Sequence, residues 1–184
     1  LLKPCLAVAS ASAVLAPILA HVQRDYAALA ADPAFHGMAS TLVGVRLFGN
    51  VATIFNVGDS RAYLLADGQA RLLSRDHSLL SDMIDDGDIT PAQAANAASF
   101  MRGLTSQFIA DAEFDEFKVN IAIHVLQPGQ RLLLCSDGLN EALNDAEIAT
   151  LLAGGADDAL LNACKASRRA GGTDDFSAIV LALD

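Results

Sequence analysis

The sequence predicts an α+β fold in which antiparallel strands form the core and helices cover them. Apolar runs of strand length occur in groups, hairpin signals join the runs of the first group, and stretches with helical spacing precede and follow the strands. The 184 residues contain no internal repeat and no linker. This length suits one domain, so we expect residues 1–184 to form a single domain.

The apolar N-terminal stretch is expected to form two helices, over residues 5–16 and 16–31. Apolar residues recur at helical spacing in the second, and the Asp32-Pro33 pair ends it. We expect a buried helix rich in small residues here, although Lys3 before an apolar run is also typical of a signal peptide. The run is shorter than the roughly 20 residues that span a bilayer, so no membrane association is expected.

The strands that follow are expected to form an antiparallel meander, with hairpin turns at Gly49-Asn50 and Asp67-Gly68. The middle of the chain is polar and partly helical, and Thr90 is expected to cap a short helix there. The strands are predicted at about 40–48, 51–57, 62–65, 69–73, 116–126, 131–135 and 177–183. The later helices are predicted near 144–153 and 157–169.

Charge and cysteine content narrow the classes of function. The net charge is -10, from 22 acidic and 12 basic residues, and this balance argues against nucleic-acid binding, which needs a basic face. The spacing of the cysteines, Cys5, Cys135 and Cys164, fits neither a zinc site nor a disulfide framework. We therefore expect buried free thiols and a cytoplasmic protein.

Two aspartates stand where apolar strands meet loops. Asp137 follows the run 132–135, and Asp174 with Asp175 precedes the last strand. Taken alone, Asp137 fits a helix cap as well as a metal ligand. Two strand ends that each offer aspartate beside glycine are more specific, because Mg²⁺ and Mn²⁺ select carboxylate oxygens. The pair therefore favours a metal site.

Two further motifs are less decisive. Asp59 in "NVGDSRAYLL" is expected to be a structural turn residue, because short aspartate side chains commonly bind local backbone. Asp76-His77 in "SRDHSLLSD" fits a metal or acid–base role, or else a cap on the helix that starts near Ser78. The remaining histidines show no partner spacing and are interpreted as structural or surface residues.

Taken in order, five segments resemble the metal-dependent protein phosphatases, the type-2C serine/threonine phosphatases, and in particular their bacterial members. These segments are "GMASTLVGV", "FNVGDSRAYLL", "LLSRDHSLL", "LLLCSDGL" and "GGTDDFSAIV". The resemblance covers nearly the whole chain. It implies an α-β-β-α sandwich, in which two antiparallel sheets are flanked by helices.

The resemblance also implies a reaction and a site. Two Mn²⁺ or Mg²⁺ ions would activate a bridging water that attacks phosphoserine or phosphothreonine in phosphoproteins, the targets of a serine/threonine kinase, without a covalent protein intermediate. By position, Asp137 and Asp174 resemble ligands of one core metal, and Asp76 resembles a ligand of a third, weaker one. The neighbouring Ser136, Gly138 and Asp175 are expected to support these ligands.

The sequence departs from the family in two ways. The N-terminal arginine, Glu-Asp and Asp-Gly-Met-Gly-Gly elements, which supply the bridging ligand, are not in this chain, so the chain alone is not expected to complete the binuclear site. We expect an N-terminal piece with a few strands, about 30 to 50 residues, to be missing. Asp175 and Ser177 also replace the usual asparagine and threonine. The alternatives are a non-catalytic binding module with this fold and a phosphatase of a stress-response anti-sigma antagonist.

Overall fold

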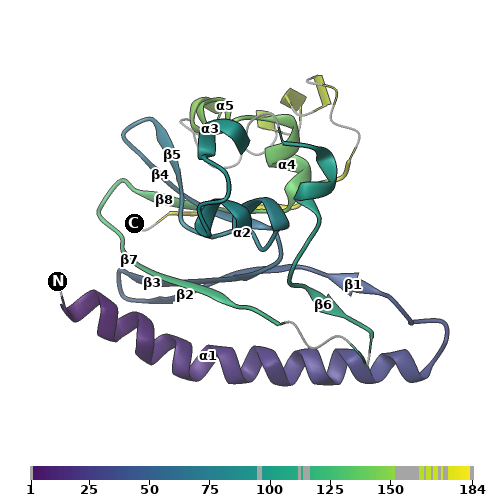
Figure 1. Cartoon of the computed structure of the whole chain (residues 1–184). Coiled ribbons are helices and arrows are strands. Elements are labelled where there is room, and N and C mark those ends of the chain that lie inside the picture. The colour runs from purple at the N-terminus through teal and green to yellow at the C-terminus, as the bar shows by residue number, and fades with distance from the viewer. Residues whose placement is uncertain are drawn as a thin grey trace. The chain divides into compact units, whose positions relative to one another are not determined.

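The computed structural model has two compact units. Unit 1 contains Leu1–Leu42, Phe55–Asp59 and Arg75–Ile121, and unit 2 contains Val43–Ile54, Ser60–Ser74 and Ala122–Asp184. Figure 1 labels the helices and most of the strands. The structure describes residues 2–94, 97–111, 113, 117–151, 162–163, 165–166, 168–169, 171 and 174–182.

A four-stranded antiparallel sheet forms the centre of unit 2. Its order is β5-β4-β8-β9, from β4 (Arg61–Ala66), β5 (Gln69–Leu72), β8 (Arg131–Cys135) and β9 (Ala178–Ala182). Strand β8 pairs with both β4 and β9, and its last residue Cys135 stands opposite Arg61 and Ala178. The two central strands are buried almost throughout, as expected for a sheet that is covered on both faces.

Each face of this sheet has its own apolar core. On one face, Tyr63 and Leu133 pack with residues of α4 (Asp137–Ala142) and α5 (Asp145–Leu151). On the other face, Leu64 and Leu132 pack with Ile54 from a strand of the second sheet. Unit 2 therefore contains a helix layer and two strand layers. Each fully buried side chain of this size contributes about 1.5–3 kcal/mol to its stability.

The pKa of Tyr63 reports on the helix-covered face. Burial raises this pKa to about 12, although the Arg61 guanidinium, which donates to the Tyr63 hydroxyl over 3.1 Å, opposes the shift. An unfolded tyrosine ionises near pH 10. Tyr63 therefore stabilises the fold fully below pH 10, and this contribution is lost as the pH rises toward 12.

We expect the free energy of unfolding to fall by about 1 kcal/mol between pH 9 and pH 11 because of Tyr63. Urea unfolding of the wild type and of Tyr63→Phe at both pH values measures this decrease in the free energy of unfolding. The Tyr63→Phe variant should lack the part that comes from Tyr63. Tyr26→Phe is the control, because it leaves Tyr63 as the sole tyrosine of the chain's two. A rise in tyrosinate absorbance centred on pH 10 in that control would contradict the prediction.

The second sheet has the order β2-β3-β7. It consists of β2 (Leu42–Phe48), β3 (Val51–Val57) and β7 (Asn120–Val125). The predicted single meander is therefore wrong, because β3 and β4 belong to different sheets. The chain turns between them at Gly58, whose φ of 94° is in the left-handed region and where a Cβ would overlap the Thr41 side chain.

Unit 1 is built on α1 (Leu2–Ala28), which continues as a 3-10 turn over Leu29–Ala31. Leu19 of α1 packs with Phe108 of β6 (Phe108–Ile109), which pairs with β1 (Ala39–Ser40). The buried Gln23 side chain donates to the Ile109 carbonyl over 3.1 Å and accepts from the Ile109 amide over 3.0 Å. These contacts fix the helix against β6.

The N-terminal prediction needs two corrections. A single helix runs through Pro17 instead of two helices; proline removes one backbone hydrogen bond, but the flanking alanine and leucine residues are good helix formers. The helix is also less buried than expected: from residue 10 onward only Leu19 and Gln23 are buried, and the Val14 side chain is 61% exposed. No helix among the described residues is long and apolar enough to cross a membrane.

Most other predicted elements are confirmed with small shifts. The strands at 51–57 and 131–135 have the predicted bounds, and Thr90 caps α3 (Pro91–Ala94) by accepting from the Gln93 amide over 3.4 Å. The α4 helix is absent from the predicted helix ranges, although the cap alternative for Asp137 implied a helix at this place. The expected helix at 157–169 lies largely outside the described residues. The remaining elements are α2 (Leu79–Asp85) and a 3-10 turn over Ser99–Arg102.

Candidate metal centre

The antiparallel pair β8–β9 brings the ends that carry the predicted ligands together. Beyond the last strand pair, the Ser136 amide donates to the Ser177 carbonyl over 3.0 Å, and the Ser177 amide donates to Ser136 Oγ over 2.9 Å. Strand pairing thus extends one residue past the sheet. Asp137 and the Asp174–Asp175 loop therefore lie at the same edge of the sheet in unit 2.

Asp137 is the first residue of α4, and Ser136 occupies the N-cap position. The alternative in which Asp137 itself is the helix cap is therefore wrong. The Ser136 side chain makes no capping bond to the helix, because its hydroxyl accepts from the Ser177 amide. Asp137 Oδ1 accepts from the Gly138 amide over 2.9 Å, which fixes the orientation of the half-buried carboxylate.

Asp174 is held in the same local manner. Its Oδ1 accepts from the following amide, that of Asp175, over 2.9 Å. Asp174 and Asp175 are both exposed. Among the described residues neither Asp137 nor Asp174 forms an ion pair, and no group of three or more His, Cys, Asp or Glu side chains is placed to hold a metal.

Gly138 allows the loop to approach the start of α4. A Cβ at this position would lie 2.8 Å from the Asp175 carbonyl oxygen and 3.2 Å from Phe176 Cβ. A carbon atom essentially never approaches a backbone oxygen so closely without displacing it. The loop that carries Asp174 and Asp175 therefore packs directly on the backbone of α4, and glycine makes this contact possible.

Asp76 lies in unit 1, in the loop that precedes α2, and its place relative to the Asp137–Asp174 pair is not determined. The residues on both sides of it are held to the end of β3. The Asn56 side chain donates to the Arg75 carbonyl over 2.7 Å, and the His77 amide donates to the Gly58 carbonyl over 3.0 Å. Ser78, not Asp76, caps α2 by accepting from the Ser81 amide, so the cap alternative for Asp76 is wrong.

His77 has a structural role. It is 2% exposed, and its Nδ1 accepts from the Gly58 amide over 3.1 Å. Burial and, next, the Arg75 charge lower the pKa of His77 to about 4, against the smaller opposite effect of Asp82. The imidazole is therefore neutral at pH 7 and serves as an acceptor, so the acid–base interpretation of the Asp76-His77 pair does not hold for His77.

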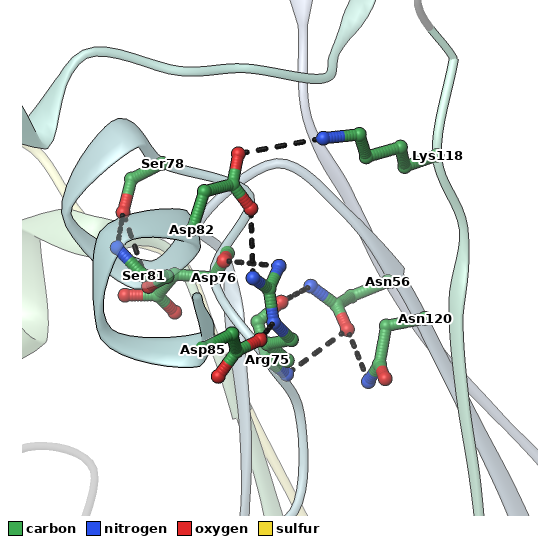
Figure 2. Close-up of polar contacts among 9 residues, drawn as sticks. All are labelled: Asn56, Arg75, Asp76, Ser78, Ser81, Asp82, Asp85, Lys118 and Asn120. Carbon is green, nitrogen blue, oxygen red and sulfur yellow. Dashed lines mark hydrogen bonds and ion pairs between the residues drawn. The ribbon is translucent and has the colours of Figure 1, made fainter. Parts of the chain in front are cut away.

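Sequence reasoning missed the polar network around Arg75, which Figure 2 shows. The Arg75 side chain donates to Asp82 and Asp85 of α2. Asn56 is fully buried, and its Oδ1 accepts from the Asn120 side chain over 3.0 Å. The acidic residues at 82 and 85, one helical turn apart after a basic residue, were the available signal.

A comparison with known protein families finds a match over most of the chain. The family model described as protein phosphatase 2C matches residues 4–167. The chain belongs to the protein phosphatase 2C family. This confirms the resemblance seen in the sequence segments, and the antiparallel sheets flanked by helices are the fold of this family's solved members.

Several bacterial members of the phosphatase 2C family are similar. The serine/threonine protein phosphatase PstP of Mycobacterium tuberculosis is 32% identical over 146 residues, which are 76% of this chain and 27% of PstP. A putative 2C-type phosphatase of Streptococcus pyogenes is 36% identical over 118 residues, 64% of this chain and 46% of the relative. The chain thus spans between about a quarter and a half of the length of these relatives.

Two solved structures of the family align well. The S. agalactiae serine/threonine phosphatase has a TM-score of 0.78 at 27% identity, and the alignment covers 88% of this chain and 66% of that one. The PstP catalytic domain in complex with two manganese ions has a TM-score of 0.69 at 28% identity, with 91% and 70% covered.

Proposed function

We propose that the protein is a metal-dependent phosphoprotein phosphatase that hydrolyses phosphoserine and phosphothreonine. The observation that carries the proposal is the β8–β9 edge, where Asp137 and the Asp174–Asp175 loop are held together by the reciprocal bonds of Ser136 and Ser177. Family membership and the manganese-bound PstP catalytic domain support a metal-dependent reaction. The spacing of the chain's cysteines, which fits no disulfide framework, supports action in a reducing cytoplasm.

The residues at this edge fit a hard divalent cation. Carboxylate oxygens are the ligands that Mg²⁺ and Mn²⁺ prefer. Asp137 and Asp174 each have one oxygen held by a backbone amide, which leaves the other oxygen for a cation. The three aspartates at this edge, Asp137, Asp174 and Asp175, also repel one another unless a cation is bound. We propose Asp137 and Asp174 as ligands of a core metal and Asp76 as a ligand of a further, weaker one.

When bound, such ions supply an activated water and neutralise the charge that develops on the phosphate and the leaving oxygen. The contribution of this chain is positional. Ser136 and Gly138 set the distance between α4 and the Asp174–Asp175 loop, and the amides of Gly138 and Asp175 orient the two carboxylates. Fixed orientation matters because small displacements of a catalytic group cost large factors in rate.

The test is hydrolysis of p-nitrophenyl phosphate and of a phosphothreonine peptide by the full-length protein, with and without Mn²⁺. We expect metal-dependent activity on both substrates, in keeping with phosphoprotein targets of a serine/threonine kinase. Activity no greater than that of the metal-free control would instead identify a non-catalytic binding module. Mn²⁺ titration by calorimetry gives an independent readout, since a binding module that lost the site would show no tight Mn²⁺ sites.

A further inference from the structure

The Arg75 guanidinium contacts a helix and a loop at the same time. Its Nη2 donates to Asp82 Oδ1 over 2.7 Å, and its Nε donates to Asp85 Oδ2, so both acidic side chains of α2 bind one arginine. Its Nη1 donates to the Asp76 carbonyl over 3.2 Å. Figure 2 shows the arginine between these groups. A planar guanidinium presents several donors in a fixed geometry, which suits such a shared contact.

The backbone of Arg75 is anchored separately from its side chain. The fully buried Asn56 donates to the Arg75 carbonyl over 2.7 Å and accepts from the Arg75 amide over 3.4 Å. The other donor to Asn56 Oδ1 is the Asn120 side chain. The arginine is therefore fixed to the end of β3, and the ion pairs connect α2 to that fixed point.

Helix α2 needs such support. It has seven residues, none of them buried, and helices of this length are not stable alone in water. Apart from the Ser78 cap, its polar contacts include the two pairs with Arg75 and one from Lys118 to Asp82 over 3.4 Å. The Arg75 side chain is 31% exposed and the Asp85 side chain 59% exposed, so these pairs are only partly shielded from water and salt.

We propose that Arg75 is a positioning residue that fixes the Asp76 loop to helix α2, so that cation binding at Asp76 depends on the ion pairs of Arg75 with Asp82 and Asp85. The part of this proposal that concerns the cation rests on the proposed function. The part that concerns the coupling of loop and helix does not. Outer contacts that orient a metal ligand typically change metal affinity by 10- to 100-fold. Arg75 acts through the backbone of Asp76, so we expect the lower end, about 10-fold.

The experiment compares Arg75→Gln with the wild type and with Arg71→Gln in the full-length protein. Arg71 is an exposed arginine on β5 and serves as the matched control. Hydrogen exchange resolved to single amides is the first readout. We expect faster exchange at the His77 amide, which bonds to Gly58, at the Asp82 amide of α2 and at the amide of Asp86, which caps the end of α2. Arg71→Gln should exchange like the wild type, and Arg75→Lys should restore part of the protection.

Mn²⁺ titration followed by electron paramagnetic resonance is the second readout. We expect the weakest Mn²⁺ site to lose about 10-fold in affinity in Arg75→Gln, and Asp76→Ala to remove that site. Asp85→Asn is a milder second variant, because the Asp85 side chain is 59% exposed. It is expected to shift both readouts in the same direction as Arg75→Gln, and it replaces that variant if Arg75→Gln does not fold.

The possible outcomes are distinct. Faster exchange in α2 with an unchanged His77 amide would overturn the coupling of loop and helix. Altered exchange at both places with unchanged Mn²⁺ affinity would overturn the dependence of the cation on Arg75. A wild type that binds no Mn²⁺ would overturn the proposed function and the cation part together, while the exchange data would still decide the coupling.

Discussion

Replacing Asp137 by asparagine is expected to lower Mn²⁺-dependent hydrolysis by the full-length protein at least about 100-fold, while the fold stays intact. Asparagine keeps the shape of the side chain and an oxygen that can accept from the Gly138 amide, as Asp137 Oδ1 does over 2.9 Å. It removes the negative charge that a divalent cation needs. Initial rates on p-nitrophenyl phosphate and the urea unfolding midpoint measure the two effects separately.

Asp145→Asn is the matched control for this variant. Asp145 is the first residue of α5, just as Asp137 is the first residue of α4. Both changes remove an acidic group from the positive end of a helix, which costs about 0.3–1 kcal/mol. The control should therefore lose a similar amount of stability and keep its activity. If Asp137→Asn also kept its activity, Asp137 would serve only the helix.

Replacing Gly138 by alanine is expected to displace the Asp174–Asp175 loop and to weaken Mn²⁺ binding together with activity. The new Cβ would lie 2.8 Å from the Asp175 carbonyl oxygen, which is backbone and not the end of a flexible side chain. Such overpacking typically costs about 1–3 kcal/mol. Urea unfolding and Mn²⁺ calorimetry on the same preparations would report stability and metal affinity.

The sign of the stability change in Gly138→Ala is informative, because alanine by itself favours the helix. In a helix interior, glycine to alanine alone stabilises by about 1 kcal/mol, so a net loss at Gly138 would come from the contact with the loop. Glu141→Ala, an exposed change in the same helix, controls for helix propensity. A Gly138→Ala protein as stable as the wild type, with unchanged Mn²⁺ binding, would mean that the loop yields without consequence.

Several elements could be predicted because local pattern and tertiary packing agree. The run 132–135 is apolar without interruption, and the structure buries it on both faces within β8. The position of Asp137 and Asp174 at strand ends also followed from the sequence, since each stands beside an apolar strand. That these two strands pair with each other is seen only in the structure. Their roles as metal ligands remain predictions that the variants above test.

Other features depend on contacts between distant residues and leave little local signal. Pro17 indicated a helix break, but one lost hydrogen bond does not end a helix with strong helix formers on both sides. The assignment of β3 and β4 to different sheets depends on the turn at Gly58. Asn56, which joins residues 19 and 64 positions away, has no local pattern that would reveal it.

The edge with Asp137 and Asp174 and the loop with Asp76 are held by different kinds of bond, and this makes ionic strength a selective variable. The Ser136–Ser177 pair consists of neutral hydrogen bonds, which dissolved ions hardly affect. Helix α2 is held through charged pairs, one of which includes the 59% exposed Asp85. At 1 M ionic strength the Debye length is only about 3 Å. Concentrated salt should therefore loosen the surroundings of Asp76 while the edge that carries Asp137 and Asp174 keeps its geometry.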